Sequence, residues 1–301
     1  MISVKNCHKQ FGALAAVRGI NLEIRTGEIL GLIGPDGAGK TTFLRLLMGL
    51  LHPTSGKIRI MGTTALKSRD HVGYMPQHFS LYPDLSVAEN LRFFADLYGV
   101  GKQQFHLKKK QLLGFSGLGP FQDRLAGHLS GGMQKKLALA SNLFHTPDVL
   151  FLDEPTTGVD PISRKELWDL LFRLNEEGMT LVVTTPYMDE AQKCHRVGLM
   201  YGGCILRCQP PEELIRDMED DIIELVTEDL SARKILQNIS GLKNIYSYAG
   251  TLHLVLESGK GLPEILKKEI QKHGIPVSSI KKINPSLEDV FLSLMDRYNN
   301  G

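Results

Sequence analysis

The sequence predicts an α/β fold built on a mostly parallel sheet, followed by a small α+β module. This prediction rests on two observations: short apolar strands alternate with helices through most of the chain, and the composition changes after Pro210 and Pro211. The 301 residues are 42% hydrophobic and 23% charged, an average globular mix that can bury a sizeable core. We therefore expect one domain over residues 1–215 and a second over residues 216–301.

The N-terminal part alternates between strands and one helix. Apolar and polar residues alternate at residues 2–4 and 20–24, as in strands with one buried face. Residues 28–33 (EILGLI) form an apolar run before a glycine-rich turn, which indicates a buried strand. Residues 41–51 (TTFLRLLMGLL) are apolar nearly all round and predict a buried helix, and residues 57–60 predict another strand.

The middle of the chain is expected to be helical between residues 86 and 143. Ser86 and Glu89 have the spacing of a capping box, which places a helix start there. Two apolar runs follow at residues 149–152 (VLFL) and 181–184 (LVVT), each with the length of a buried strand. Strands that alternate with helices in this order are typical of a parallel sheet.

The C-terminal part predicts a smaller module of strands and helices. We expect strands and helices at the following places, in order: a strand at 222–226, a helix at 231–239, strands at 245–248 and 252–256, a helix at 263–274 and an amphipathic segment at 285–295.

Charge and hydropathy narrow the possible partners. The formal net charge is +2, so we expect no nucleic-acid partner. The longest charge run, Lys108 to Lys110, is typical of a solvated helix face. No stretch reaches the ~18 apolar residues of a membrane span, and the first residues lack the pattern of a signal peptide. We expect a cytoplasmic protein that would reach a membrane only through a partner.

The cysteines do not predict a metal site. The chain contains Cys7, Cys194, Cys204 and Cys208. Neither the pair Cys194 and His195 nor the spacing of Cys204 and Cys208 matches a standard zinc pattern. We expect unlinked, reduced thiols.

A glycine-rich turn predicts a phosphate-binding loop. The segment GPDGAGKT fits G-x4-G-K-[ST], follows a predicted strand and opens a predicted helix. Glycines let backbone N–H groups surround phosphate oxygens, and the helix N-terminus adds partial positive charge. We expect Lys40 to reach the β and γ phosphates of ATP and the Thr41 hydroxyl to bind Mg²⁺. The predicted nucleotide-binding residues of this loop are Gly34, Pro35, Asp36, Gly37, Ala38, Gly39, Lys40, Thr41 and Thr42.

Two carboxylates follow the apolar strand at residues 149–152. Strand ends in open α/β sheets face the ligand crevice, so Asp153 and Glu154 are expected beside the phosphate-binding loop. Asp153 is the candidate to hold Mg²⁺ or its water, and Glu154 is the candidate general base for the attacking water.

Several further motifs resemble those of the ABC ATPases. Residues 129–133 (LSGGM) resemble the family signature, with Met133 where many members have Gln. Gln77 resembles the Q-loop glutamine, and residues 158–160 resemble the D-loop. Phe11 stands where the family places an aromatic ring against adenine. Together with the phosphate-binding loop and the strand that ends in two carboxylates, these motifs cover residues 1 to about 215.

The resemblance implies a P-loop ATPase of ABC type. It implies a mostly parallel core flanked by an antiparallel β subdomain and by a helical subdomain that carries the signature. It also implies that ATP and Mg²⁺ are bound and that two such domains sandwich each ATP. Gln77 would be a catalytic residue that contacts the Mg²⁺ ion and relays motion to the membrane partner. The signature residues Ser130, Gly131 and Gly132 would face the ATP of the second domain. The implied partners are that second domain and an integral membrane permease, with this chain peripheral on the cytoplasmic face of the membrane.

Other segments are similar to the exporter branch of the family, which handles drugs, polysaccharides or lipids. Residues 81–91 and 93–99 are similar to that branch, and residues 285–292 (PSLEDVFL) resemble the end of its C-terminal module.

One position departs from the family pattern. Pro186 lies in the switch segment at residues 184–191, where the family has a histidine that bonds to the γ-phosphate. Proline has no side-chain donor and no N–H, so this contact is lost. This departure leaves open a catalytically weak cassette in a heterodimer as an alternative to an active exporter subunit. A soluble ABC-fold ATPase without a transport role is a second, independent alternative.

Overall fold

The structure is a computed structural model that describes residues 1–78, 81–229, 231–237, 239, 241–248, 251–257 and 262–300. The chain divides into two compact units, Met1–Cys208 and Gln209–Gly301. The division lies before the expected boundary at residue 215, because helix α7 (Pro211–Arg216) packs on α10 (Leu287–Asn300) of the second unit.

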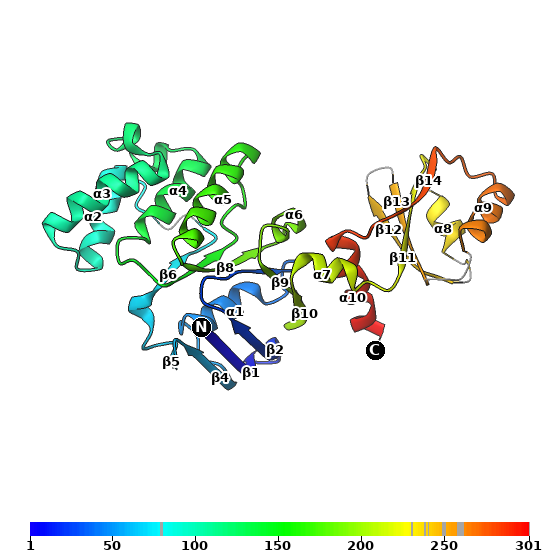
Figure 1. Ribbon diagram of the computed structural model, residues 1–301, viewed down its shortest axis with the longest axis horizontal. Helices are drawn as coiled ribbons and strands as arrows, with labels where there is room; N and C mark the ends of the chain where they lie inside the picture. Colours follow the sequence, from blue (N-terminus) through cyan, green and yellow to red (C-terminus); the bar gives the residue numbers. More distant parts are fainter. Residues whose placement is uncertain are drawn as a thin grey trace. The chain divides into compact units, whose positions relative to one another are not determined.

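A six-stranded sheet forms the centre of the first unit (Figure 1). Its strands in order across the sheet are β10 (Cys204–Gln209), β9 (Arg196–Tyr201), β3 (Ile29–Ile33), β8 (Thr180–Thr185), β7 (Val149–Asp153) and β6 (Val72–Met75). The neighbours from β9 to β6 pair in parallel, which confirms the predicted sheet. The predicted strands β3, β7 and β8 are buried at every residue, whereas β6, β9 and β10 were not predicted.

Helices complete the core. Helix α1 (Lys40–Leu47) starts at the phosphate-binding loop and ends earlier than the expected Leu51, since Gly49 adopts a positive φ of 69°. Helix α5 (Pro161–Glu176) begins at the N-cap Asp160, and the short α6 (Met188–Ala191) follows β8. Three 3₁₀ helices are found at Arg69–His71, Gly119–Phe121 and Ala126–His128.

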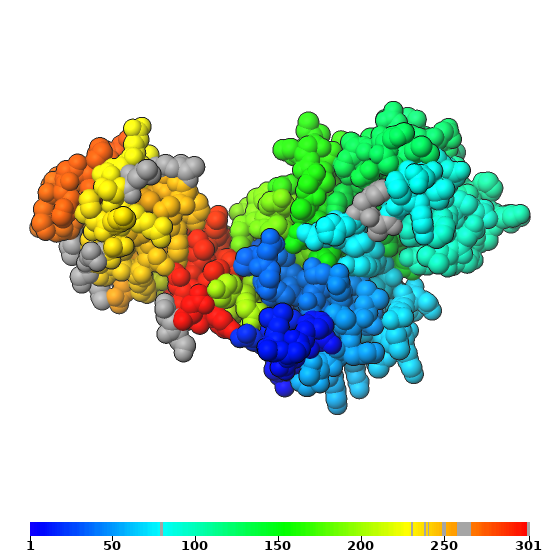
Figure 2. All heavy atoms as spheres, turned by 180° about the vertical axis from the view of Figure 1, so that it is seen from behind, coloured from blue at the N-terminus to red at the C-terminus, as the bar shows by residue number. Residues whose placement is uncertain are grey.

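Two further regions lie on different sides of the first unit, as Figures 1 and 2 both show. One is an antiparallel sheet with the strand order β2 (Leu14–Ile24), β1 (Ile2–Phe11), β4 (Ser55–Ile60) and β5 (Thr63–Thr64). The other is helical and contains α2 (Val87–Leu97), α3 (Lys102–Ser116) and α4 (Gly131–Ser141). The predicted capping box is present, because Ser86 and Glu89 exchange both hydrogen bonds.

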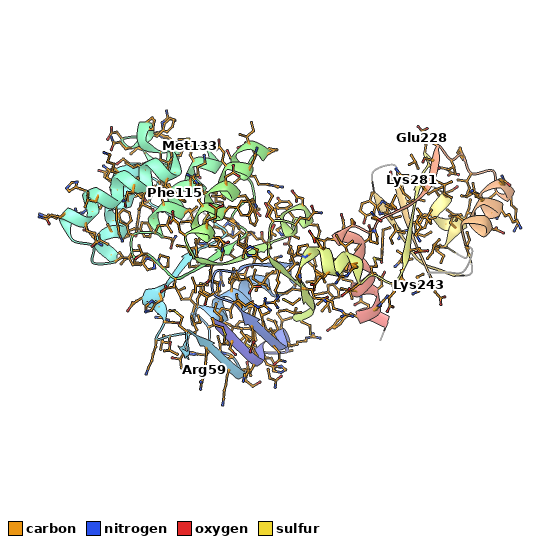
Figure 3. The ribbon with its side chains drawn as sticks, in the orientation of Figure 1. Arg59, Phe115, Met133, Glu228, Lys243 and Lys281 are labelled. Carbon is orange, nitrogen blue, oxygen red and sulfur yellow. The ribbon has the colours of Figure 1, made fainter. Side chains whose placement is uncertain are left out.

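In the part of the second unit that the structure describes, a four-stranded antiparallel sheet is accompanied by three further helices besides α7. The sheet order is β12 (Leu242–Tyr248), β13 (Thr251–Leu256), β11 (Asp221–Val226) and β14 (Ser279–Ile283), of which β14 was not predicted. Residues of α8 (Ala232–Leu236) and α9 (Leu262–Lys272) join the apolar core of the sheet. Lys243 and Lys281, labelled in Figure 3, pair with Asp220 and Glu224.

None of the helices that the structure describes has both the length and the apolar character needed to cross a membrane.

Close packing fixes the shape of the turn between β3 and α1. Gly39 is the N-cap of α1 with a φ of 100°, and a Cβ added there would lie 2.4 Å from the carbonyl oxygen of Ala16. Gly37 also has a positive φ, 79°, but an added Cβ would meet nothing within 4 Å. Substitutions at Gly37 and Gly39 can therefore distinguish the cost of a left-handed backbone conformation from the cost of a close contact with β2.

We expect Gly39→Ala to destabilise the protein far more than Gly37→Ala. Both changes force alanine into a left-handed conformation at about 1–2 kcal/mol, but only Gly39→Ala adds overpacking of about 1–3 kcal/mol. Urea unfolding followed by the fluorescence of the single, buried Trp168 measures both effects. Equal losses in the two variants would contradict the packing explanation.

Candidate functional site

The phosphate-binding loop holds the Lys40 side chain in a buried position. Its Nζ donates hydrogen bonds to the carbonyl oxygens of Gly34 at 2.7 Å and Pro35 at 3.1 Å. The loop is tied to a neighbouring turn, because the N–H of Gly203 donates to the carbonyl oxygen of Ala38 at 3.2 Å. The loop therefore presents one fixed ammonium group at the start of α1.

The ends of β7 and β8 bring the two carboxylates to this loop. Asp153 pairs with Thr184 in the parallel register, and the Thr184 hydroxyl donates to Asp153 Oδ1 at 2.7 Å. The Thr41 hydroxyl donates to the same oxygen at 3.0 Å. Glu154 follows with a positive φ of 48°, and its N–H donates to the Thr184 hydroxyl oxygen at 2.9 Å. This turn directs consecutive carboxylates to different partners.

The Glu154 carboxylate is buried and engaged on both oxygens. Oε1 lies 3.4 Å from Lys40 Nζ. Oε2 accepts hydrogen bonds from Gln77 Nε2 at 2.7 Å and from the Thr157 hydroxyl at 3.2 Å. The structure thus joins Gln77, Lys40 and Glu154, which the sequence had suggested separately, whereas the contribution of Thr157 was missed.

A cleft of about 660 Å³ opens beside these groups. Of the expected residues, Asp36 to Thr42, Gln77 and Glu154 line it. Gly34, Pro35 and Asp153 lie behind it, where they contact Lys40 and Thr41. The lining residues that the sequence analysis missed are Leu14, Ala15, Ala16, Arg18, His78, Gly202 and Gly203. Gly202 and Gly203 follow an apolar strand, and this pair of glycines in the sequence could have predicted a tight turn.

Phe11 is not among the residues that line this cleft. It ends β1, its side chain is 45% exposed, and Lys9 Nζ lies 5.0 Å from the centre of its ring. An exposed ring at this position is available to stack on a planar group.

The signature residues lie outside this cleft. Ser130 is the N-cap of α4, and its hydroxyl oxygen accepts from the N–H of Met133 at 3.3 Å; Met133 is labelled in Figure 3. An added Cβ at Gly132 would lie 2.4 Å from Ser163, so close packing on α5 requires glycine there. Gly131 is exposed and lines a second, smaller cleft of about 210 Å³, which shares Gln77 and His78 with the first.

Pro186 also lies outside the lining of the cleft, in a segment held by Arg164. The Arg164 guanidinium stacks over the Tyr187 ring at 4.2 Å and lies 3.3 Å from Asp189 and 3.6 Å from the buried Glu190. His195 does not replace the absent histidine, since it is an exposed residue whose Nδ1 accepts a hydrogen bond from the N–H of Ile29 at 2.9 Å.

Metal binding by the cysteines gains no support. Burial raises the pKa of the Cys7 thiol to about 11 and that of Cys194 to about 12. Among the residues that the structure describes, no group of three histidine, cysteine or acidic side chains could hold a metal ion.

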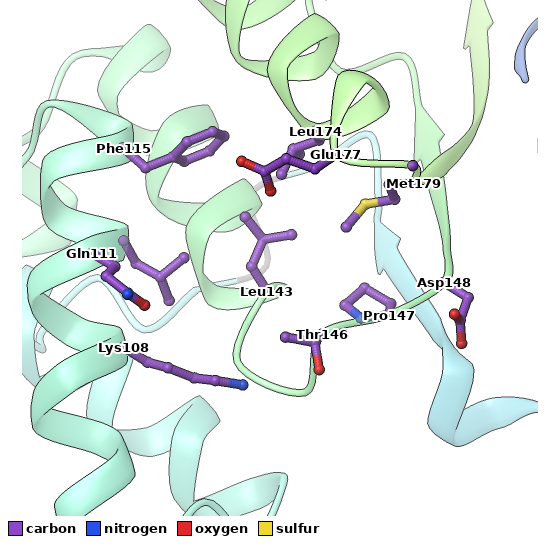
Figure 4. A pocket seen from close by; sticks show the side chains of 12 residues that line it. Lys108, Gln111, Phe115, Leu143, Thr146, Pro147, Asp148, Leu174, Glu177 and Met179 are labelled. Atoms are coloured by element: carbon purple, nitrogen blue, oxygen red, sulfur yellow. The ribbon is translucent and has the colours of Figure 1, made fainter. Parts of the chain in front are cut away.

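Another cleft, of about 670 Å³, lies between α3, the turn before β7 and α5 (Figure 4). Apolar side chains including Leu143 and Met179 form much of its lining, and Lys108 at its edge donates to the carbonyl oxygen of Phe144 at 2.7 Å. It shares no lining residue with the cleft beside Lys40 and Glu154.

The sequence matches two known families. Residues 17–157 match the family described as ABC transporter. Residues 210–295 match the family described as ATP-binding protein DrrA1-3-like, C-terminal domain.

Curated relatives are named for export. The chain is 40% identical over 307 aligned positions to the probable multidrug ABC transporter ATP-binding protein YbhF of Escherichia coli (strain K12). This alignment covers 98% of this chain and 52% of YbhF. It is 34% identical over 304 positions to the Nod factor export ATP-binding protein I of Ralstonia nicotianae. That alignment covers 99% of this chain and 94% of the Nod factor protein. The chain therefore spans about half the length of YbhF and nearly all of the Nod factor protein.

Solved structures share the fold of the first unit. CbiO1 from Clostridium perfringens, part of the ABC transporter complex cbiONQ, has a TM-score of 0.67 and 28% identity, with 72% of this chain and 90% of CbiO1 covered. The cassette MJ0796, solved as a dimer in a post-hydrolysis state bound to ADP and Pi, has a TM-score of 0.64 and 28% identity, with 70% of this chain and 98% of MJ0796 covered. With its site, its two matched domains and these relatives, the chain belongs to the ATP-binding proteins of ABC transporters, in the branch whose relatives are named for multidrug and Nod factor export.

Proposed function

We propose that this chain hydrolyses ATP to power an ABC exporter, as one of two ATP-binding domains that act on an integral membrane permease. One observation carries the proposal: the Lys40 ammonium, the Glu154 carboxylate and the Gln77 amide line one cleft beside a glycine-rich loop, and the Asp153 carboxylate lies behind it, where it accepts a hydrogen bond from Thr41. This is the set of groups that binding phosphate and activating water require.

The loop residues Gly34 to Thr42 would bind the phosphates of ATP. Lys40 is already at the head of α1, where its charge and the helix N-terminus act on the same anion. Phe11 would stack against the adenine ring, from the exposed end of β1.

The residues around Asp153 suit Mg²⁺, which prefers oxygen ligands and usually keeps several waters. Three side chains each offer an oxygen ligand: the hydroxyl of Thr41, the carboxylate of Asp153 and the amide oxygen of Gln77. When bound, the ion would offset part of the phosphate charge.

Glu154 is the proposed base. In the structure its Oε1 pairs with Lys40, and an incoming phosphate would compete for that ammonium group. Its Oε2 must also be freed from Gln77 or Thr157 before it can accept a proton from water.

Ser130, Gly131 and Gly132 would bind the γ-phosphate of ATP held by a second cassette. Their place at the start of α4 exposes backbone N–H donors, and their position outside the cleft beside Lys40 fits a role toward another chain. ATP would then hold two cassettes together until hydrolysis. The chain would sit on the cytoplasmic face of the membrane through the permease.

A weak cassette in a heterodimer is the second candidate, because Pro186 supplies no donor to the γ-phosphate. The presence of Glu154 beside Lys40 argues against a weak cassette, because the proposed base is retained. A soluble ATPase without a transport role is not favoured by relatives that are named for export.

We expect Lys40→Ala to abolish ATP binding, because the phosphates would lose their side-chain cation. Titration with a fluorescent ATP analogue measures the affinity, with Lys67→Ala, a change of an exposed lysine outside the cleft, as the control. Unchanged affinity in a folded Lys40→Ala protein would refute the assignment of the loop.

Glu154→Gln should keep ATP binding, stop hydrolysis and trap a dimer. The amide is nearly isosteric with the carboxylate but cannot accept the proton of the attacking water. Size-exclusion chromatography with ATP and Mg²⁺ should show the larger species, and the exposed Glu177→Gln serves as the control. Wild-type turnover in Glu154→Gln would show that another group is the base.

Pro186→His tests the heterodimer candidate. A hydrogen bond to a charged group contributes ~1.5–3 kcal/mol, so restoring one should raise the turnover of the protein alone by roughly tenfold to a hundredfold if its absence limits the rate. As a control, the ATP affinity of Pro186→His is measured, and we expect it to stay close to that of the wild type. High wild-type turnover without any gain from histidine would instead indicate an ordinary homodimer.

A further inference from the structure

Lys135 links the signature helix to the loop that carries Gln77. It lies in the second turn of α4 and is partly buried. Its Nζ donates to the backbone carbonyl oxygen of Gln77 at 2.7 Å. Burial lowers the pKa of this lysine, while the charges of Glu154 and Asp153 act in the opposite direction, so the ammonium group is electrostatically coupled to both carboxylates.

Gln77 extends this link to the proposed base. Its backbone carbonyl accepts the bond from Lys135, and its side-chain Nε2 donates to Glu154 Oε2 at 2.7 Å. Two hydrogen bonds thus connect α4 with the carboxylate at the end of β7. A displacement of α4 would act on Glu154 through one residue.

The neighbouring Lys136 has a different partner. It pairs with Glu166 of α5. The two lysines share a helix, a charge and nearly the same position in the sequence, but only the contact described for Lys135 reaches the Gln77 loop. Lys136 therefore provides a matched control.

We propose that Lys135 is a positioning residue that couples the two ATP sites of the dimer: it transmits movement of the signature helix, whose first residues contact one ATP, to Gln77 and Glu154 at the other. This rests on the proposed function, in which Ser130, Gly131 and Gly132 face the ATP of the second cassette. When that γ-phosphate is captured, α4 moves as a rigid element and carries the Gln77 carbonyl with it. The Gln77 amide then leaves Glu154 Oε2, which becomes free to accept a proton from water.

Without the ammonium group, capture of one ATP no longer frees the base at the other site. Lys135→Met should lower kcat by roughly tenfold, the effect of one lost hydrogen bond to a charged donor. It should also lower the Hill coefficient for ATP from near two toward one, because two coupled sites give a coefficient of at most two. The affinity for a fluorescent ATP analogue should stay within about twofold, because Lys135 does not line the cleft beside Lys40.

The experiment measures the ATP dependence of hydrolysis for the full-length wild type and four variants. Lys135→Arg keeps a charged donor and should restore both kcat and the Hill coefficient, whereas Lys136→Met should behave as wild type. Lys135→Gln, which keeps a polar donor without the charge, provides a second test if the methionine variant folds poorly. Urea unfolding monitored by Trp168 checks the folding of each variant.

Wild-type kcat and Hill coefficient in folded Lys135→Met, or in Lys135→Gln if the former does not fold, would overturn this proposal alone. Equal losses in Lys136→Met would also overturn it, since they would indicate a general effect of charge on the helix. Absence of ATP hydrolysis in the wild type would overturn the proposed function and, with it, the role of Lys135.

Discussion

The buried pair of Lys40 and Glu154 is the interaction around which the first unit is arranged. The two side chains are 4% and 7% exposed, and their charged atoms lie 3.4 Å apart. Removing one charge of such a pair is destabilising unless the other charge keeps further partners, as Lys40 does in the carbonyl oxygens of Gly34 and Pro35. The parallel pairing of β7 with β8 and of β8 with β3 brings the ends of these strands to one edge of the sheet. The phosphate-binding loop and the carboxylates therefore meet at that edge.

The same pair is part of a set of contacts that holds the side chains of the site in place. Lys40 is held by the carbonyl oxygens of its own loop and by Glu154, and the other oxygen of Glu154 is held by Gln77 and Thr157. An anionic phosphate competes with these contacts for the ammonium group. Under the proposed function, phosphate binding and the release of Glu154 would thus be linked by charge.

Acidic residues of α10 hold this helix on the sheet of the second unit. Asp289 of α10 is fully buried and accepts hydrogen bonds from Tyr248 at 3.2 Å and from Ser286, and it pairs with His253 at 2.8 Å. Asp296, two turns later, accepts from Tyr246 at 2.6 Å. These bonds satisfy the Asp289 carboxylate, which would otherwise be costly to bury, and with those of the partly buried Asp296 they determine how α10 lies on β12 and β13.

The sequence by itself determined the features that depend on neighbouring residues. The glycine-rich loop with Lys40, the strand that ends at Asp153 and Glu154, the capping box of α2 and the three central strands were predictable, because spacing and apolar runs specify local structure directly. Only the tertiary structure decided that Gln77 contacts Glu154, 77 residues away, and that Lys135 holds the Gln77 loop. It also decided the edge position of β6, the strand β14 and the exposed position of Phe11. These features depend on the order of strands in a sheet and on packing between distant segments, which no local pattern contains.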